Sequence, residues 1–219
     1  MGMIKFILSF VLLAALALAP SLSFAQTITL PTEMPLNDKQ IKRLKNGKPV
    51  VSVKKHYTQN GKTAKVFSMI IIDAHPEQIW SVLTDCQRAP EYVPGLKSCE
   101  ILERSVDGNW EIRRHINNSK LLPKMVSEFR NDFAYPHSIS FVRTGGDLSI
   151  NQGEWRLSPI EGTTKTLVTY NCTLAAKTVI PDSMIRKSIR KKIPKVMLAL
   201  EEEVMTDINT ARLTNVSTP

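Results

Sequence analysis

Residues 180–211 read IPDSMIRKSIRKKIPKVMLALEEEVMTDINTA, and this stretch decides the fold. Its apolar side chains recur at steps of three and four residues, which places them on one stripe of a helix. They are Ile185, Ile189, Ile193, Met197, Leu200, Val204 and Ile208. Pro181 followed by Asp182 and Ser183 is a helix-start signal. Pro194 predicts a kink, because proline cannot donate to the carbonyl four residues earlier. The stretch therefore predicts a long, kinked amphipathic helix that needs a broad apolar partner.

The residues before this helix supply that partner. Strand-like runs at 50–57 and 64–73 flank a hairpin signal at Asn60-Gly61, and strand patterns with short turns dominate residues 96–175. Short turns favour an antiparallel meander. We predict an α+β protein in which a curved antiparallel sheet of about seven strands wraps the long helix and leaves a hollow behind it.

Three short helices complete the prediction. Two follow the second strand directly: one enters at His75-Pro76-Glu77 and ends near Asp85, and the other covers residues 88–92. A third helix, residues 39–45, lies near the N-terminus and is capped by Asn37-Asp38. We expect this helix and the strand at 50–57 to be an N-terminal extension, in addition to the main sheet and the long helix.

The first 25 residues have the pattern of a secretory signal. Lys5 is followed by an apolar run, then by Pro20 and by Ser23-Phe24-Ala25, a small-x-small cleavage site. We expect cleavage before Gln26 and secretion, to the bacterial periplasm; an uncleaved anchor is the alternative. The predicted division is a signal peptide at 1–25, an arm and short helix at 26–48, the main domain at 49–213 and a tail at 214–219.

The positive charge of the chain is concentrated in one place. The net charge is +9, and seven of the basic residues lie between Lys177 and Lys195, with Asp182 the sole acid among them. Because a secreted protein seldom meets nucleic acid, we expect no nucleic-acid partner; an anionic membrane surface or an acidic partner fits instead. The alternative is a solvated helix face that keeps the protein soluble. The patch residues we single out are Arg186, Lys187, Arg190, Lys191 and Lys195.

Three cysteines leave at least one thiol unpaired. In an oxidising compartment Cys86 and Cys99 could close a short loop, although sequence does not show whether their Cα atoms come within bridging distance. Cys172 falls on the apolar side of a predicted strand, which is typical of a buried, unreactive thiol.

Two motifs near the start of the domain resemble a known superfamily. Residues 73–85, DAHPEQIWSVLTD, and residues 91–95, EYVPG, resemble the opening of the START-like superfamily, also called SRPBCC or helix-grip. Further along the chain, GDL at 146–148 and GEWRL at 153–157, with residues 163–170, resemble the later hairpin of the superfamily. VIP at 179–181 resembles the entry to its last helix. The nearest branch is the coenzyme Q-binding START-like and polyketide cyclase/dehydrase proteins, and the resemblance covers about residues 64–209.

The resemblance implies a helix-grip fold with a cavity between sheet and helix that holds a lipid-like molecule. Two features depart from the family pattern. Cys86 stands where an aromatic residue is expected, and a secretory signal does not suit the mitochondrial quinone-chaperone role known for part of that branch.

The candidate cavity residues are those predicted to face inward from the strands and the helix. They are Ile112, Arg114, Met125, Ser127, Phe129, Phe141, Trp155, Val168, Tyr170, Ile189, Ile193 and Met197. Arg114 alternates with Ile112 and Ile116, so it either meets an anionic ligand group in the cavity or is turned to solvent by a bulge. Tyr170 and Trp155 could orient a ligand headgroup, or could be plain core residues.

No catalytic constellation accompanies these residues. The four histidines have no ligand-like spacing, no GxSxG motif occurs, and Gly145-Gly146 does not precede a helix. We therefore expect no metal, no cofactor and no catalytic residues. The prediction is a monomeric binding or carrier protein for a hydrophobic small molecule, lipid or quinone-like. The alternatives are a polyketide cyclase/aromatase-like enzyme and a cavity-free interaction module.

Overall fold

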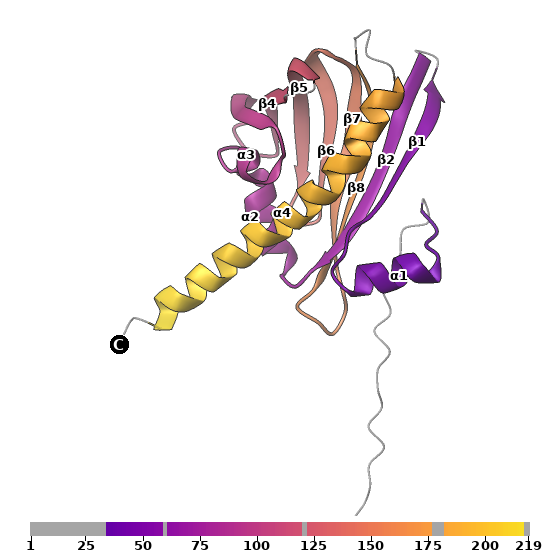
Figure 1. Cartoon of the computed structure of the whole chain (residues 1–219). Coiled ribbons are helices and arrows are strands. Elements are labelled where there is room, and N and C mark those ends of the chain that lie inside the picture. Colours follow the sequence, from indigo (N-terminus) through magenta and orange to yellow (C-terminus); the bar gives the residue numbers. More distant parts are fainter. Residues whose placement is uncertain (1–33, 59–60, 120–121, 177–181, 217–219) are drawn as a thin grey trace, which may run out of the picture.

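The computed structural model describes residues 34–58, 61–119, 122–176 and 182–216, and Figure 1 shows one curved sheet crossed by one long helix. Several predictions fall on residues outside these ranges: the signal region, position 60 of the predicted hairpin dipeptide, Lys177 and Pro181. The helices are α1 (Asp38–Lys45), α2 (Pro76–Thr84), α3 (Ala89–Tyr92) and α4 (Asp182–Val216). The strands are β1 (Val50–Thr58), β2 (Gly61–Ile72), β3 (Leu96–Arg104), β4 (Trp110–Ser119), β5 (Leu122–Ala134), β6 (Ser138–Gly146), β7 (Leu148–Pro159) and β8 (Thr166–Ala176).

The sheet is antiparallel throughout and has the order β1-β2-β8-β7-β6-β5-β4-β3. Strands β3 to β8 form the predicted meander, and β8 then pairs with β2, so the crossover through α2 and α3 carries the chain from one side of the sheet to the other. The α+β helix-grip prediction is confirmed: the sheet has eight strands, which are the predicted seven and the extra N-terminal strand β1.

Strand β2 is buried on both faces, as its nearly continuous apolar sequence indicates. Ile70 and Ile72 pack toward α2 and α4, and Met69 packs on the opposite face against Leu44 of α1. Helix α1 begins at a capping box in which the Asn37 side chain accepts from the Gln40 N–H and the Gln40 side chain accepts from the Asn37 N–H. The N-terminal addition therefore covers the outer face of the sheet.

Helix α4 crosses the inner face diagonally and extends past the body of the protein (Figure 1). At 1.5 Å per residue its 35 residues span about 52 Å. Its predicted stripe is buried at Met197, Leu200 and Val204. Pro194 lies inside the helix, and the helix continues beyond the predicted end near residue 211, because Ala211, Arg212 and Leu213 all favour helix.

An ion-pair cluster ties the second half of α4 to the short helices. Arg88, just before α3, donates to Glu203 at 2.7 Å and to Asp207 at 2.6 Å, and these bonds raise the pKa of its guanidinium above the ordinary value. The first half of α4 packs instead on β1 and β2, where Arg190 donates to the Val53 carbonyl at 2.9 Å.

Candidate functional site

A cavity of about 240 Å³ lies between the inner face of the sheet and α4. Strands β4 to β8 form its wall, α4 closes it on one side, and α2 and the segment around α3 close it near one end. Its lining is Leu83, Tyr92, Val93, Arg113, His115, Ser127, Phe129, Asn131, Ile139, Phe141, Leu148, Asn151, Trp155, Tyr170, Ile193, Val196 and Met197. The space between helix and sheet is therefore not completely filled, and its wall is mainly apolar with a few polar groups.

The structure brings seven of the twelve predicted residues together in this lining. They are Ser127, Phe129, Phe141, Trp155, Tyr170, Ile193 and Met197. Of the other five, Val168 is fully buried in the core beneath α2 and α4, and Ile189 packs beside Phe141 and Cys172 on the first half of α4. Met125 is half-buried and lies outside the lining.

The prediction that Ile112 and Arg114 face the cavity is corrected, because β4 presents its other face. Glu111, Arg113 and His115 point inward, and Arg114 lies on the outer face with 38% of its side chain exposed. There it donates to Glu128 at 2.8 Å and to Glu100 at 3.2 Å on the two neighbouring strands. The carboxylates of Glu128 and Glu100 stabilise Arg114 on the outer face. Arg113, which points inward, is buried with a carboxylate partner from the same strand, and this pairing lowers the cost of burying its charge.

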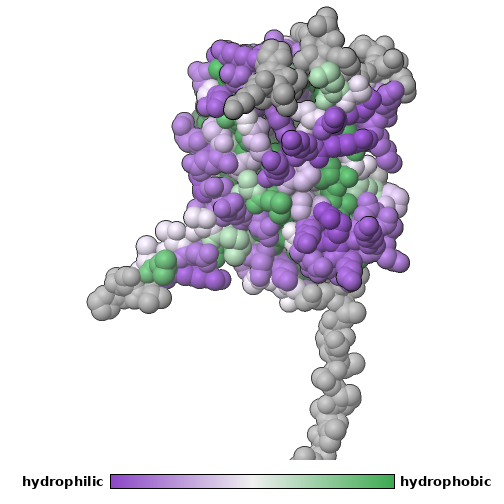
Figure 2. Space-filling view, viewed as in Figure 1, coloured by the Kyte–Doolittle hydropathy of each residue, from purple (hydrophilic) through white to green (hydrophobic). Residues whose placement is uncertain are grey.

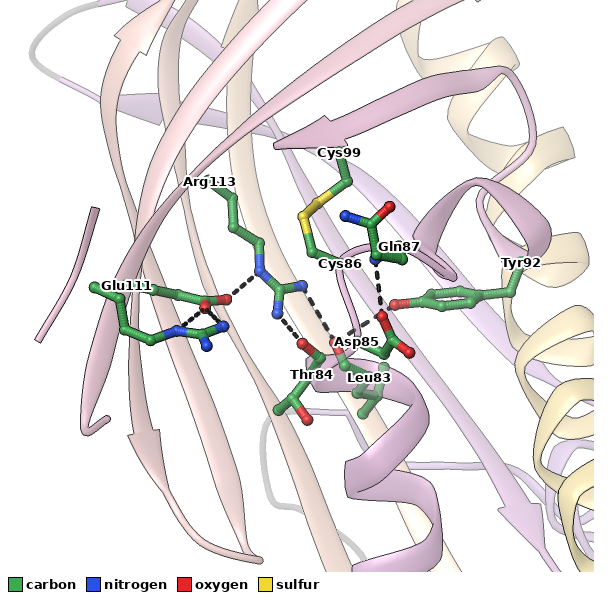
Figure 3. Close-up of a disulfide and its surroundings, with 10 residues drawn as sticks. Leu83, Thr84, Asp85, Cys86, Gln87, Tyr92, Cys99, Glu111 and Arg113 are labelled. Carbon is green, nitrogen blue, oxygen red and sulfur yellow. Dashed lines mark hydrogen bonds and ion pairs between the residues drawn. A yellow bond between two sulfur atoms is a disulfide. The ribbon is translucent and has the colours of Figure 1, made fainter. Parts of the chain in front are cut away.

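That partner is Glu111, whose side chain is 1% exposed. Its carboxylate accepts from Arg113 of the same strand and from Arg104 of β3, the latter at 2.7 Å. Figure 3 shows the Arg113 guanidinium between Glu111 and the end of α2, where it donates to the carbonyls of Leu83, at 3.4 Å, and Thr84. All three guanidinium nitrogens of Arg113 are thus bonded to protein acceptors.

A second cleft, of about 410 Å³, is lined in part by Glu111, which does not line the main cavity. It is formed by α2, the turn between β3 and β4, and the turn between β5 and β6. Trp80 packs edge-on against Phe133 and Tyr135 in its wall, with ring centroids 5.8 and 5.4 Å away. Glu111 and Arg113 therefore separate this cleft from the main cavity.

A disulfide joins the α2–α3 connection to edge strand β3. Cys86 and Cys99 have Cα atoms 5.4 Å apart, within the range that a bridge requires. The bridge lies beside the α2 carbonyls that hold Arg113 (Figure 3). The sequence left this pairing open, and the structure shows it formed.

His115 is the most unusual polar group of the cavity wall. Its Nε2 is buried and has no hydrogen-bond partner among the described residues. Burial, and secondly the positive charge of Arg113, lower the pKa of its imidazole to about 4. The ring packs edge-on against Phe129, with the centroids 4.8 Å apart. At neutral pH this position of the wall therefore holds a neutral imidazole.

Aromatic rings continue the wall from Phe129 across the sheet. Phe141 contacts Phe129 at 6.1 Å and stacks on Tyr170 at 6.0 Å, and Trp155 contacts Tyr170 at 4.5 Å between centroids. Burial raises the pKa of the Tyr170 hydroxyl well above its ordinary value. Burial likewise raises the pKa of the Cys172 thiol to about 12, and the predicted burial of this thiol is confirmed.

Gly153 allows this aromatic wall to form. It lies opposite Phe141 on β6 and Cys172 on β8. A Cβ at this position would come within 2.0 Å of the Asn171 carbonyl oxygen and within 2.8 Å of Cζ of Phe141. The Phe141 ring thus lies over bare backbone, which only glycine provides.

The face of α4 turned away from the cavity is basic. Lys187, Lys191 and Lys195 are exposed at helical spacing, and Met184 and Leu198, 55% and 45% exposed, lie at the two ends of the same stripe. Figure 2 shows hydrophobic patches along the line where α4 crosses the body, with hydrophilic residues around them. One segment of α4 therefore has a cavity on one side and basic side chains on the other.

Within the described part of the chain, no helix is long and apolar enough to cross a membrane, and no group of three or more histidine, cysteine or acidic residues could hold a metal ion.

The sequence matches the family model for polyketide cyclase / dehydrase and lipid transport over residues 72–201. Since the match covers more than half of the chain, the protein belongs to this family, which is START-like as the motifs indicated. No protein of curated function matches the sequence.

Solved structures share the fold at low sequence identity. A START superfamily protein from Mycobacterium smegmatis aligns with TM-score 0.57 and 22% identity, over 65% of this chain and 97% of its own. The Zhui aromatase/cyclase from a Streptomyces species aligns with TM-score 0.58 and 15% identity, over 67% and 96%. A STAR-related lipid transfer protein from Xanthomonas axonopodis aligns with TM-score 0.52 and 16% identity, over 71% and 98%. These neighbours show the shared fold, and the description of the matching family names polyketide cyclase / dehydrase and lipid transport.

Proposed function

We propose that this protein is a secreted, periplasmic carrier that binds a hydrophobic small molecule, lipid or quinone-like, in the cavity between sheet and α4. The observation that carries the proposal is the hollow itself: about 240 Å³ of space whose wall is mainly apolar and aromatic. The disulfide between Cys86 and Cys99 supports the location, since such bonds persist in oxidising compartments.

The alternative, a cyclase/aromatase-like enzyme, receives less support from the cavity wall. Arg113 has all three nitrogens bonded to protein acceptors, and His115, with a pKa of about 4, is a weak base at neutral pH. The deprotonated form of Tyr170 is disfavoured by burial. A carrier needs none of these groups to exchange protons.

Native mass spectrometry of the protein purified from its own compartment tests the carrier proposal. We expect a reproducible hydrophobic adduct on the native protein, which Ser127→Phe removes because Ser127 lines the cavity. Ser140→Phe is the matched control, because Ser140 is exposed on β6. A bare protein mass in every preparation, or an adduct that survives Ser127→Phe, argues against the cavity as the site.

We further propose that α4 docks on an anionic membrane while the ligand passes. Ile193 and Met197 line the cavity, and Lys191 and Lys195 are exposed on the same turns of the helix. Each basic residue near an anionic surface contributes about 1 kcal/mol to binding. Docking through α4 would place the cavity next to the lipid surface, so that the hydrophobic ligand could pass between membrane and cavity over a short distance.

Vesicle co-sedimentation tests the docking proposal. Changing Lys187, Lys191 and Lys195 to glutamate should abolish binding to phosphatidylglycerol-containing vesicles, and added salt should weaken wild-type binding. The matched control changes Lys39, Lys42 and Lys45 of α1, which are exposed and give the same change in net charge. Equal loss of binding in both triple variants would point to net charge instead of the α4 face, and absence of wild-type binding would reject docking.

A further inference from the structure

His115 gives the cavity a polar position that no described residue satisfies. It lies on β4 opposite Ser127 of β5, and both side chains line the cavity. Its Nε2 is buried without a hydrogen-bond partner among the described residues. Because a buried polar atom without a partner is costly, such a position inside a binding cavity is explained by a ligand that supplies the partner.

The charges around His115 indicate which ligand groups the cavity accepts. Arg113, the charged residue of the lining, is paired with buried Glu111 and also donates to two backbone carbonyls of α2. His115 is neutral at pH 7, because burial and Arg113 lower the pKa of its imidazole to about 4. The other polar groups of the lining include Ser127, Asn131 and Asn151, which carry no charge. A ligand carboxylate or phosphate would thus be buried without a free cation to pair with.

A hydroxyl is the neutral group that fits best. A neutral imidazole has one N–H donor and one acceptor nitrogen, and which nitrogen carries the hydrogen is set by its partners. A hydroxyl both donates and accepts, so it can bond to His115 in either tautomer. A carbonyl can bond only to the N–H form. The aromatic and apolar wall at Phe141, Trp155 and Met197 would hold the rest of the ligand.

The volume limits the size of the enclosed part of the ligand. Pockets for drug-sized molecules measure roughly 300–1,000 Å³. A cavity of about 240 Å³ therefore holds a small ring system or a short chain segment.

We infer that the cavity selects a neutral amphipathic molecule, an apolar ring or short chain bearing a hydroxyl that is held against His115, and that it rejects carboxylates and phosphates of the same shape. This inference rests on the proposed carrier function and names the ligand class for the same cavity. His115 is a specificity-determining residue in this reading.

Three probes of nearly the same shape test it: naphthalene, 2-naphthol and 2-naphthoate, titrated into purified protein at pH 7 by calorimetry or by competition with a fluorescent hydrophobe. We expect 2-naphthol to bind about fivefold more tightly than naphthalene, the ratio that one net hydrogen bond of about 1 kcal/mol gives. We expect 2-naphthoate to bind at least tenfold more weakly than 2-naphthol, because its charge is buried unpaired.

His115→Phe keeps a planar ring and removes both nitrogens, so it should bind naphthalene and 2-naphthol equally. His56→Phe, at an exposed position of β1, should keep the wild-type ratio. If none of the probes binds to the wild type, the carrier function and this inference both fail. If all three bind with equal affinity, or 2-naphthoate binds best, the inference fails and the carrier function stands. A preference for 2-naphthol that survives His115→Phe also overturns the inference.

Discussion

Removing the disulfide between Cys86 and Cys99 should cost the protein a measurable part of its stability. The bond closes a loop with a sequence separation of 13 residues. In the chain-entropy model a loop of this length lowers the entropy of the unfolded chain enough to contribute about 3 kcal/mol to the free energy of unfolding. The perturbation is the double substitution Cys86→Ser and Cys99→Ser, which deletes the bond and leaves Cys172 in place.

Urea denaturation followed by circular dichroism measures the effect. With a denaturant dependence of roughly 2 kcal/mol/M, a loss of about 3 kcal/mol lowers the midpoint by about 1.5 M. Wild-type protein treated with reductant is the matched control, and its midpoint should coincide with that of the double variant. Hydrogen exchange should accelerate in β3, which is an edge strand tied to the α2–α3 connection by this bond, and should be unchanged in β2.

A thiol count provides the independent check. Unfolded, unreduced wild type should expose one reactive thiol, Cys172, and three after reduction. Three thiols without reductant, or identical midpoints for oxidised and reduced protein, would refute the reasoning.

Three further predictions follow from buried groups. His115 has a pKa of about 4 in the folded protein against 6.5 in the unfolded chain, so below pH 6.5 the unfolded chain binds a proton that the folded protein does not. The free energy of unfolding should therefore fall by up to ~3 kcal/mol between pH 6.5 and pH 4. Denaturation at a series of pH values should show this loss, and His115→Phe should make the free energy of unfolding depend less on pH in that range. Glu111→Gln should cost ~3–5 kcal/mol because it leaves Arg113 buried and unpaired, whereas Glu154→Gln in the more exposed pair with Arg156 should cost less than ~1 kcal/mol; equal midpoints in thermal unfolding contradict this. Leu200→Ala should cost ~2–5 kcal/mol because Leu200 is fully buried under α4, and Leu198→Ala, 45% exposed, should cost less than ~1 kcal/mol; similar unfolding free energies would show that α4 is not packed as described.

Periodicity and turn signals were sufficient to predict the fold. The apolar steps from Ile185 to Ile208 identified α4 and the face that it buries, and proline and glycine punctuation separated the strands. These signals are local, and the core depends on them directly, because a helix or strand with one apolar face has to bury it.

The candidate site was predicted less completely, because strand alternation gives two faces and does not say which one is inside. On β4 the isoleucines Ile112 and Ile116 were the obvious inner face, and the structure turns Glu111, Arg113 and His115 inward instead. The inward choice depends on Glu111 pairing with Arg104 across the β3–β4 hairpin and on Arg113 reaching the end of α2, a contact between residues 30 positions apart in sequence. The sequence does contain one signal for the inner face: an acid and a base at positions 111 and 113 point to the same side of a strand, where they can pair with each other.

One wall of the cavity depends on a glycine, which has only a hydrogen atom where other residues have a side chain. Gly153 lets the Phe141 ring approach the backbone of β7 closely. An alanine methyl at this position would collide with the Asn171 carbonyl oxygen and with the Phe141 ring, so both β8 and this part of the cavity wall would have to shift. One methyl group beneath an aromatic ring is therefore enough to change the shape of the cavity, although no polar lining group is altered.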